Sequence, residues 1–220
     1  MIKKKVKNTE LYEEVWKMTT KTKDLEEKNI KFFKQIAKYY DLPIFSNWLN
    51  SPQKKILNII KIKPKSRILD VGFGTGNFLK FLYEYDKSLE LYGIDISKEM
   101  LDIARKKLNR KAKLKLQPVE KLKKENYFDY VFSTEAFHHF PNQDMAIRNM
   151  HNSLKNNGKL IIIDLTFGRF FNWLFHKIEP GNSKMNMMED FKILFKQYKF
   201  KNIKQKKLGW FFILTAGEKW

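Results

Sequence analysis

Hydrophobic positions follow two different periods along this chain. Over residues 1–62 they recur at helical spacing, as at Ile30 and Phe33, which predicts an N-terminal helical region. Ser51-Pro52 is typical of an N-cap followed by the first residue of a second helix, which is expected to continue through Ile56 to Ile60. From Ser66 onward, short β-type runs alternate with longer helical segments. This alternation predicts βαβ units around a parallel sheet.

Five runs have the pattern of parallel strands. They are Arg67–Val71, Glu90–Asp95, Lys113–Leu116, Phe128–Ser133 and Lys159–Leu165. Helices are expected after Gly76, from Ser97 as an N-cap, and over Asn142–Leu154. Asn156–Gly158 is expected to form the turn into the fifth strand.

The C-terminal part of the chain changes direction more sharply. A helix is expected over Met188–Tyr198. Two strands, over Phe200–Lys206 and Gly209–Ala216, are separated only by Lys207-Leu208, which predicts an antiparallel hairpin. The whole pattern therefore predicts a mostly parallel sheet that a C-terminal hairpin completes.

Composition adds a question about charge. The 220 residues include 44 lysines and arginines against 24 acidic residues, a formal net charge of +20. This charge suits a nucleic-acid or anionic-membrane partner, but the lysines are spread along the chain, as in a proteome-wide bias. With no cysteine, the chain has no disulfide, thiolate metal site or cysteine nucleophile, and no metal site is expected. Because neither a secretory signal nor a membrane-spanning apolar run is visible, a cytoplasmic location is expected.

A glycine-rich turn follows the first predicted strand. Asp70 lies near the end of that strand, and Gly72, Gly74 and Gly76 lead from it into a helix, so the backbone can approach a ligand closely. Asp95 closes the second strand 19 residues after Gly76, as a carboxylate that binds ribose hydroxyls should. The turn and Asp95 together predict a nucleoside cofactor.

Two residues separate the candidate cofactors. A dinucleotide turn would have glycine where this chain has Asn77. Asp70 would repel an anionic pyrophosphate, whereas it suits the cationic amino group of S-adenosylmethionine (SAM). The charge argument favours SAM over a nicotinamide cofactor. The alternative that Asp70 only orders the turn stays open.

Successive motifs within residues 56–164 also favour SAM as the cofactor. They are Ile68–Gly76, Gly93–Ser97, Phe128–Ser133 and Leu154–Leu160. In this order they resemble the motifs of class I SAM-dependent methyltransferases. Residues 36–41 and the pair His138-His139 make the chain most similar to the small-molecule branch, which includes ubiquinone and menaquinone C-methyltransferases. The resemblance implies a Rossmann-like α/β fold, a three-layer sandwich with a mostly parallel seven-stranded sheet, N-terminal helices and a C-terminal antiparallel hairpin.

The resemblance also implies which residues bind the cofactor. They are Asp70, Gly72, Phe73, Gly74, Gly76, Asp95, Ile96, Val119 and Ser133. Asp70 would lie near the amino group of SAM, Asp95 at its ribose and Ile96 on its adenine. Pro118 stands where the family usually has an acidic residue that contacts the adenine amino group, so a backbone group around Val119 is expected to make that contact.

The acceptor side rests on the loop after the fourth strand. Methyl transfer from a sulfonium is an in-line displacement, which needs a base only when the nucleophile is protonated. Ligands of open α/β sheets bind beyond the carboxyl ends of the strands, which places Glu135, His138 and His139 beside the cofactor. His138 and His139 are the candidate catalytic bases, with the alternative that they only hydrogen-bond the loop.

An aromatic stretch with helical spacing lies in an expected insertion over residues 166–187. Its apolar residues are Phe167, Phe170, Phe171, Leu174, Phe175 and Ile178. It is expected to cover an apolar acceptor, to contact a membrane peripherally, or to pack on the core. Residues 1–62 are expected to form part of the active-site cover, and residues 63–220 the methyltransferase domain.

These features favour a SAM-dependent methyltransferase that acts on a small aromatic or lipophilic acceptor. An RNA or other nucleic-acid methyltransferase is less favoured, because Ser133–Ala136 differs from the Asn/Asp-Pro-Pro-aromatic motif of amino-group methylases. A non-catalytic SAM-binding interaction module stays open as a third hypothesis. The sequence predicts neither the oligomeric state nor the acceptor atom.

Overall fold

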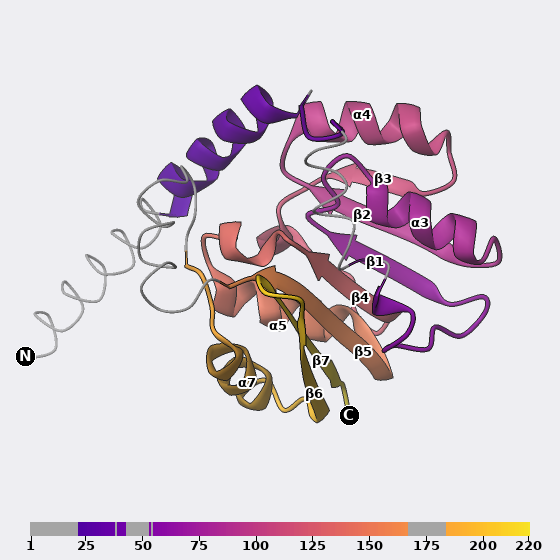
Figure 1. Ribbon diagram of the computed structural model, residues 1–220, viewed down its shortest axis with the longest axis vertical. Coiled ribbons are helices and arrows are strands. Elements are labelled where there is room, and N and C mark those ends of the chain that lie inside the picture. Colours follow the sequence, from indigo (N-terminus) through magenta and orange to yellow (C-terminus); the bar gives the residue numbers. More distant parts are fainter. Residues whose placement is uncertain (1–21, 38, 43–52, 54, 167–183) are drawn as a thin grey trace, which may run out of the picture.

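One mixed sheet organises the part of the chain that the computed structural model describes, residues 22–37, 39–42, 53, 55–166 and 184–220. The order of its seven strands is β3-β2-β1-β4-β5-β7-β6 (Figure 1). The strands are β1 (Arg67–Val71), β2 (Glu90–Asp95), β3 (Lys113–Leu116), β4 (Phe128–Thr134), β5 (Leu154–Leu165), β6 (Lys201–Leu208) and β7 (Phe212–Glu218). Strands β1 to β5 pair in parallel, and β7 runs antiparallel between β5 and β6. The predicted sheet and its C-terminal hairpin are confirmed.

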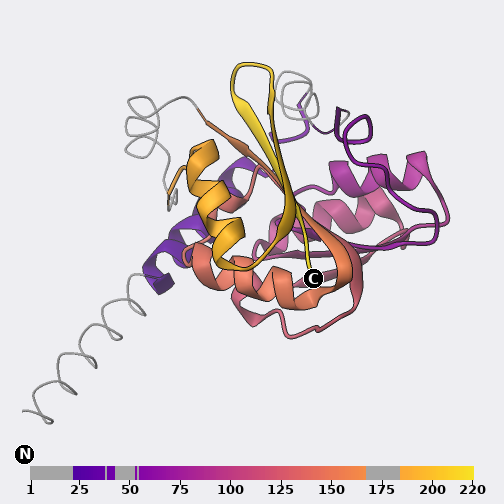
Figure 2. The same ribbon diagram turned by 90° about the horizontal axis from the view of Figure 1, so that it is seen from below.

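Helices cover both faces of this sheet (Figures 1 and 2). They are α3 (Asn77–Tyr85), α4 (Lys98–Leu108), α5 (Gln143–Ser153) and α7 (Met188–Gln197), with short 3₁₀ turns η1 (Val119–Lys121) and η2 (Phe137–His139). Apolar residues of α3 and α4 join one buried cluster, and those of α5 and α7 join a second cluster on the other face. Two cores with the sheet between them form the predicted three-layer sandwich.

Side-chain caps begin two of the helices, and the predicted N-cap at Ser97 is one of them. Ser97 precedes α4, and its Oγ accepts a hydrogen bond from the backbone N–H of Met100 at 3.2 Å. Asn142 precedes α5, and its Oδ1 accepts one from the N–H of Met145 at 2.9 Å. Each side chain satisfies an amide that the first turn of a helix leaves unpaired. The N-cap at Ser97 fixes where α4 begins, directly after the end of β2.

Two predicted turns were wrong. Lys207 and Leu208 belong to β6, and the hairpin turns at residues 209–211, where Gly209 adopts a left-handed φ of +76°. Glycine adopts this conformation without a steric penalty, which places the turn there. Residues Asn156–Gly158, predicted as a turn, instead lie within β5, which starts at Leu154 and is irregular near its pairing with Phe128.

The N-terminal region is described in parts. Residues 22–36 form a helix, and residues 53, 55 and 56 are helical before a turn at 57–59. The second predicted helix therefore ends at Ile56 rather than continuing to Ile60. Its predicted start at Ser51-Pro52 and the aromatic stretch of residues 167–178 both lie outside the described residues. Within the described part of the chain, every helix is too short or too polar to cross a bilayer.

Candidate active site

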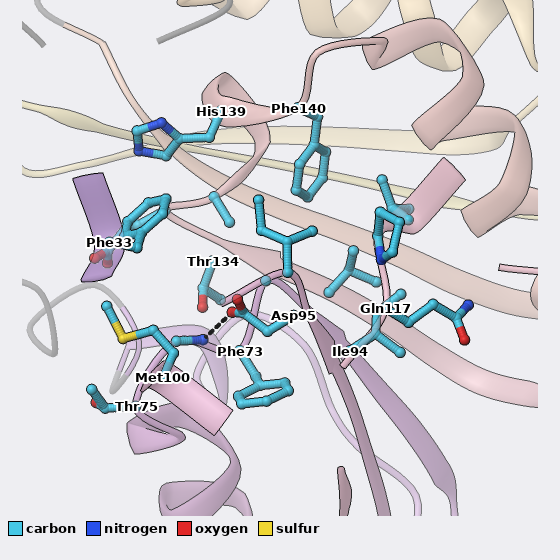
Figure 3. A pocket seen from close by; sticks show the side chains of 18 of the residues that line it. Phe33, Phe73, Thr75, Ile94, Asp95, Met100, Gln117, Thr134, His139 and Phe140 are labelled. Carbon is cyan, nitrogen blue, oxygen red and sulfur yellow. Dashed lines mark hydrogen bonds between the residues drawn. The ribbon is translucent and has the colours of Figure 1, made fainter. Parts of the chain in front are cut away.

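A cavity of about 940 Å³, its open mouth included, lies at the carboxyl ends of β1, β2 and β4 (Figure 3). The turn after β1 forms its floor, and Glu26 and Phe33 of the helix at 22–36 contribute to its wall. Apolar and aromatic side chains dominate the lining, among them Phe33, Tyr40, Phe73, Ile94, Met100 and Phe140. Although the chain is strongly basic, no lysine or arginine lines the cavity among the described residues.

Gly72 and Gly74 of the turn lack a side chain for different reasons. At Gly72 an added Cβ would lie 2.5 Å from the Cβ of Ala136, so this glycine allows the turn after β1 to touch the loop after β4. At Gly74 an added Cβ would meet nothing within 4 Å, although Gly74 lines the cavity. Gly74 therefore leaves open space for a ligand beside the backbone, whereas Gly72 serves packing.

Asp95 connects the end of β2 to this turn. Its Oδ2 accepts a hydrogen bond from the N–H of Gly74 at 2.8 Å (Figure 3). Its Oδ1 accepts one from the N–H of Ser97 at 2.8 Å. Burial raises the pKa of Asp95 to about 6, against the lowering effect of its backbone hydrogen bonds. The carboxylate lines the cavity and retains acceptor capacity for two hydroxyl groups.

Asp41 ties the N-terminal region to the glycine turn. Its Oδ1 accepts hydrogen bonds from Thr75 Oγ1 at 2.8 Å and Asn77 Nδ2 at 3.1 Å, and its carboxylate pairs with Lys107 at 2.8 Å. Burial opposes ionisation of Asp41, but the hydrogen bonds from Lys107 and Thr75 lower its pKa. Sequence reasoning missed Asp41, because the contact joins residues that are far apart in the chain.

The two histidines of η2 point in different directions. His139 lines the cavity, and its ring lies 4.9 Å from that of Phe33, centroid to centroid. The carbonyl of His139 also accepts a hydrogen bond from Asn29 Nδ2 at 2.7 Å, which fastens the helix at 22–36 over the site. His138 is turned away, with its Nδ1 2.5 Å from Asp164 Oδ1.

The segment after β3 forms the far end of the cavity. Gln117, Pro118, Val119 and Glu120 line it. Asn149 Nδ2 of α5 donates to the carbonyls of Val119 and Glu120, both at 3.0 Å, and so holds η1 in place. Burial raises the pKa of Glu120, a wall residue that the sequence did not single out.

Known proteins share this architecture and these motifs. A methyltransferase-domain family model matches residues 69–162. An uncharacterised methyltransferase of Staphylococcus carnosus is 31% identical over 147 residues, which cover 63% of this chain and 68% of that protein. The chain belongs to the class I SAM-dependent methyltransferases.

Further relatives of this methyltransferase differ in their acceptors. The Thermotoga maritima demethylmenaquinone methyltransferase is 28% identical over 140 residues, covering 62% of this chain and 61% of that protein. A Haemonchus contortus phosphoethanolamine N-methyltransferase, solved with phosphomonomethylethanolamine and S-adenosylhomocysteine (SAH), superposes with a TM-score of 0.67 at 16% identity, covering 84% of this chain and 60% of that one. The chain spans 68% and 61% of the length of the Staphylococcus carnosus and Thermotoga maritima proteins, and 54% of the length of a similar uncharacterised protein of Haemophilus influenzae.

The cavity of the methyltransferase fits its cofactor, SAM. The space beside Gly74 and the carboxylate of Asp95 match the needs of a nucleoside that lies on the turn. Of the residues predicted to bind it, the structure brings together at the cavity wall Gly72, Phe73, Gly74, Asp95, Ile96 and Val119. His139, one of the two candidate bases, lies at the same wall.

Four predicted site residues lie outside this wall as described: Asp70, Gly76, Ser133 and His138. Ser133 is buried on β4, and because side chains alternate along a strand, it points to the opposite side from Thr134, which lines the cavity. Gly76 packs against α4, where an added Cβ would lie 3.0 Å from Leu108. Asp70 is fully buried behind the wall.

Proposed function

We propose that this methyltransferase transfers the methyl group of SAM to a small acceptor with an aromatic or apolar body. The observation that carries the proposal is the lining of the cavity. Beyond the glycine turn the wall includes the aromatic rings of Phe33, His139 and Phe140 (Figure 3), and Tyr40 also lines it. Such walls favour burial of an apolar or aromatic ring.

The main task of the protein in this reaction is to align the methyl group of SAM with the nucleophile of the acceptor. SAM supplies an electrophilic methyl group on a sulfonium that leaves as a neutral thioether. Asp95 and the backbone at Gly74 orient the donor, and the helix at 22–36 excludes water through Phe33. His139 is the side chain that we propose as base for a protonated nucleophile, since it lines the aromatic part of the cavity.

A nucleic-acid acceptor is the second hypothesis, motivated by the net charge of +20. A phosphate backbone would need cations around the opening of the site. The described lining contains no lysine or arginine, and Lys107, which donates to the lining residues Thr75 and Asn77, is paired with Asp41, so the lining favours the small-molecule acceptor.

The direct test is isotope labelling. The protein is incubated with cell extract and methyl-labelled SAM, and mass spectrometry identifies the small molecules that gain the label. We expect a labelled small molecule of aromatic or lipophilic character. Label found only in RNA or DNA would overturn the proposal. No labelled product, despite SAH binding by calorimetry, would instead favour a non-catalytic SAM-binding module.

A further inference from the structure

A second cleft lies on the face of the sheet that carries α5 and α7. On this face α5 packs against β5, and α7 packs against β6 and β7 (Figure 1). The connection from β3 to β4, residues 117–127, contains only the 3₁₀ turn η1 and loop. A cleft of about 770 Å³, its open mouth included, is lined by this connection together with β2 and β3.

The residue pattern of β3 and of the following loop places lysines around this cleft. Side chains alternate along β3, so Lys113 and Lys115 line the cleft, whereas Leu114 packs against the core on the other face. In the loop, Leu122 is buried in the second core and holds the loop against the sheet. Its neighbours stay exposed. The lysines that line the cleft are Lys113, Lys115, Lys121, Lys123 and Lys124.

This cluster exceeds what the basic composition of the chain explains. Five of the twelve lining residues are lysines, whereas lysine and arginine together make up 44 of the 220 residues. Among the described residues, no carboxylate lines the cleft, and none of the five lysines forms an ion pair with a described carboxylate. Lys113 donates to Tyr92 Oη at 3.1 Å, and Lys124 Nζ lies 3.7 Å from the ring centre of Tyr127. The cleft therefore concentrates positive charge that an anionic ligand would compensate.

The type of cation indicates the type of anion. The planar guanidinium of arginine suits the two oxygens of a carboxylate, but the described lining contains no arginine. An ammonium group acts as a point charge, which suits the oxygens of phosphate. One singly charged anion would leave most of the five lysines uncompensated, whereas a chain of phosphates brings several negative charges into one cleft. The volume also falls in the range of about 300–1,000 Å³ that small-molecule sites occupy.

We propose that this lysine cleft is a second binding site, separate from the cofactor cavity, for a small molecule that carries a polyphosphate, such as a nucleoside triphosphate. The five ammonium groups surround the phosphate oxygens, and binding changes no covalent bond. The ring of Tyr92 lines the cleft and is available to the rest of the ligand. Ile94 and Gln117 line both the cleft and the cofactor cavity, so the two sites are neighbours.

Calorimetry with inorganic tripolyphosphate as the probe tests the site. The probe is titrated into the full chain at neutral pH and constant ionic strength, with and without saturating SAH. We expect saturable binding of about one equivalent that persists when SAH fills the cofactor cavity. In the presence of SAH, adenosine triphosphate should bind as well, and adenosine, which lacks phosphate, should not.

Two double variants of equal charge localise the binding. Lys115→Gln combined with Lys123→Gln should weaken tripolyphosphate at least about tenfold, because two charged contacts are lost. Lys192→Gln combined with Lys196→Gln is the matched control, since both lysines are exposed on α7, which packs on β6 and β7. This control should weaken the probe less than about twofold, because distant exposed charges are screened by salt. Unchanged SAH affinity in both variants checks that the fold and the cofactor cavity are intact.

Each outcome decides the proposal. Saturable binding that SAH leaves intact and that only the cleft variant weakens supports the site. Displacement of tripolyphosphate by SAH would place the probe in the cofactor cavity and overturn the proposal. Equal weakening in both double variants, or no saturable binding at all, would mean that the cleft is not a specific site. Binding of single-stranded RNA that the cleft variant abolishes, without saturable binding of tripolyphosphate, would also overturn the proposal and favour a nucleic-acid contact.

Discussion

The carboxylate of Asp95 accepts a hydrogen bond from the backbone N–H of Gly74 at 2.8 Å, and this one contact joins the end of β2 to the turn after β1. The second oxygen of Asp95 accepts a hydrogen bond from the N–H of Ser97 and so joins the end of β2 to the start of α4 as well. The side chain of Asp95 therefore holds the turn in shape and also lines the cavity. Its replacement should affect the conformation of the turn as well as ligand binding.

We expect Asp95→Asn to weaken SAH binding about 10- to 100-fold, because an amide loses one acceptor and turns a donor toward a backbone N–H. Calorimetry measures the change. Since the pKa of Asp95 is about 6, the affinity of the wild-type protein should also fall as the pH drops through 6. Asp102→Asn is the control, because Asp102 is an exposed partner of Lys98 on α4. Unchanged SAH affinity in Asp95→Asn would contradict the role given to Asp95.

Gly72 and Gly74 should respond differently to alanine. Gly74→Ala introduces a methyl group into open space at a φ of +55°, so folding loses about 1–2 kcal/mol while SAH binding falls at least about tenfold. Gly72→Ala should destabilise the fold more, because its Cβ would meet Ala136 at 2.5 Å. Urea unfolding and calorimetry measure the two quantities.

A matched control separates backbone strain from ligand contact. Gly209 also has a left-handed φ, +76°, with nothing within 4 Å of an added Cβ, but it lies in the β6–β7 hairpin. Gly209→Ala should therefore lose similar stability and keep its SAH affinity. If Gly74→Ala binds SAH as tightly as Gly209→Ala does, the space beside Gly74 is not the cofactor site.

The sequence predicted the parts of the site that depend on local pattern. The turn at Gly72–Gly76 and the carboxylate of Asp95 follow from residue type and strand ends, and both lie where expected. Ser133, which the resemblance assigns to the cofactor, is buried on β4 next to Thr134, and it is Thr134 that lines the cavity.

Long-range contacts could not be predicted in the same way. Asp41 approaches Thr75 only after the helix at 22–36 packs over the turn, and no local pattern in the sequence encodes this pairing. Glu135 was visible as a titratable residue of the loop after β4. The raised pKa of Glu135 depends on its burial and, after that, on Asp164 and Asp70, which tertiary packing brings close.

We expect Asp41→Asn to loosen the cover over the site. Its ion pair with Lys107 is partly exposed, with side-chain exposures of 38% and 18%, so the loss of stability should be about 1 kcal/mol or less. SAH affinity should fall several-fold, because asparagine offers Thr75 and Asn77 only one uncharged acceptor oxygen and turns an amide donor toward Lys107. Calorimetry and thermal unfolding measure these changes.

The exposed pair of Asp24 and Lys28, on the helix at 22–36, offers the control for this variant. Asp24→Asn removes an ion pair without touching the turn and should leave SAH affinity unchanged. Equal effects of both variants on SAH would show that the contacts of Asp41 with the turn do not matter.

Stability of the ligand-free protein should depend on pH through Glu135. Its pKa is raised in the folded state, so its stabilising contribution is complete below the unfolded value of about 4.3 and is lost as the pH rises toward the folded value. Glutamine cannot ionise, so Glu135→Gln should gain stability relative to the wild type between pH 5 and 8. Urea unfolding across this range measures the gain, and a stability difference independent of pH would contradict the argument.

His139 and His138 offer a test of the candidate base. His139→Gln should lower kcat about 10²- to 10⁴-fold while SAH affinity changes little, if the acceptor loses a proton to this imidazole in the transition state. His138→Gln should mainly reduce stability, by about 1–3 kcal/mol, because buried Asp164 loses a partner. His151→Gln is the control for kcat, since His151 lies on α5 against Phe200. The rates are measured with the acceptor that isotope labelling identifies. An unchanged kcat in His139→Gln would mean that the acceptor reacts without this base, and alignment by Asp95 and the glycine turn would then account for the catalysis.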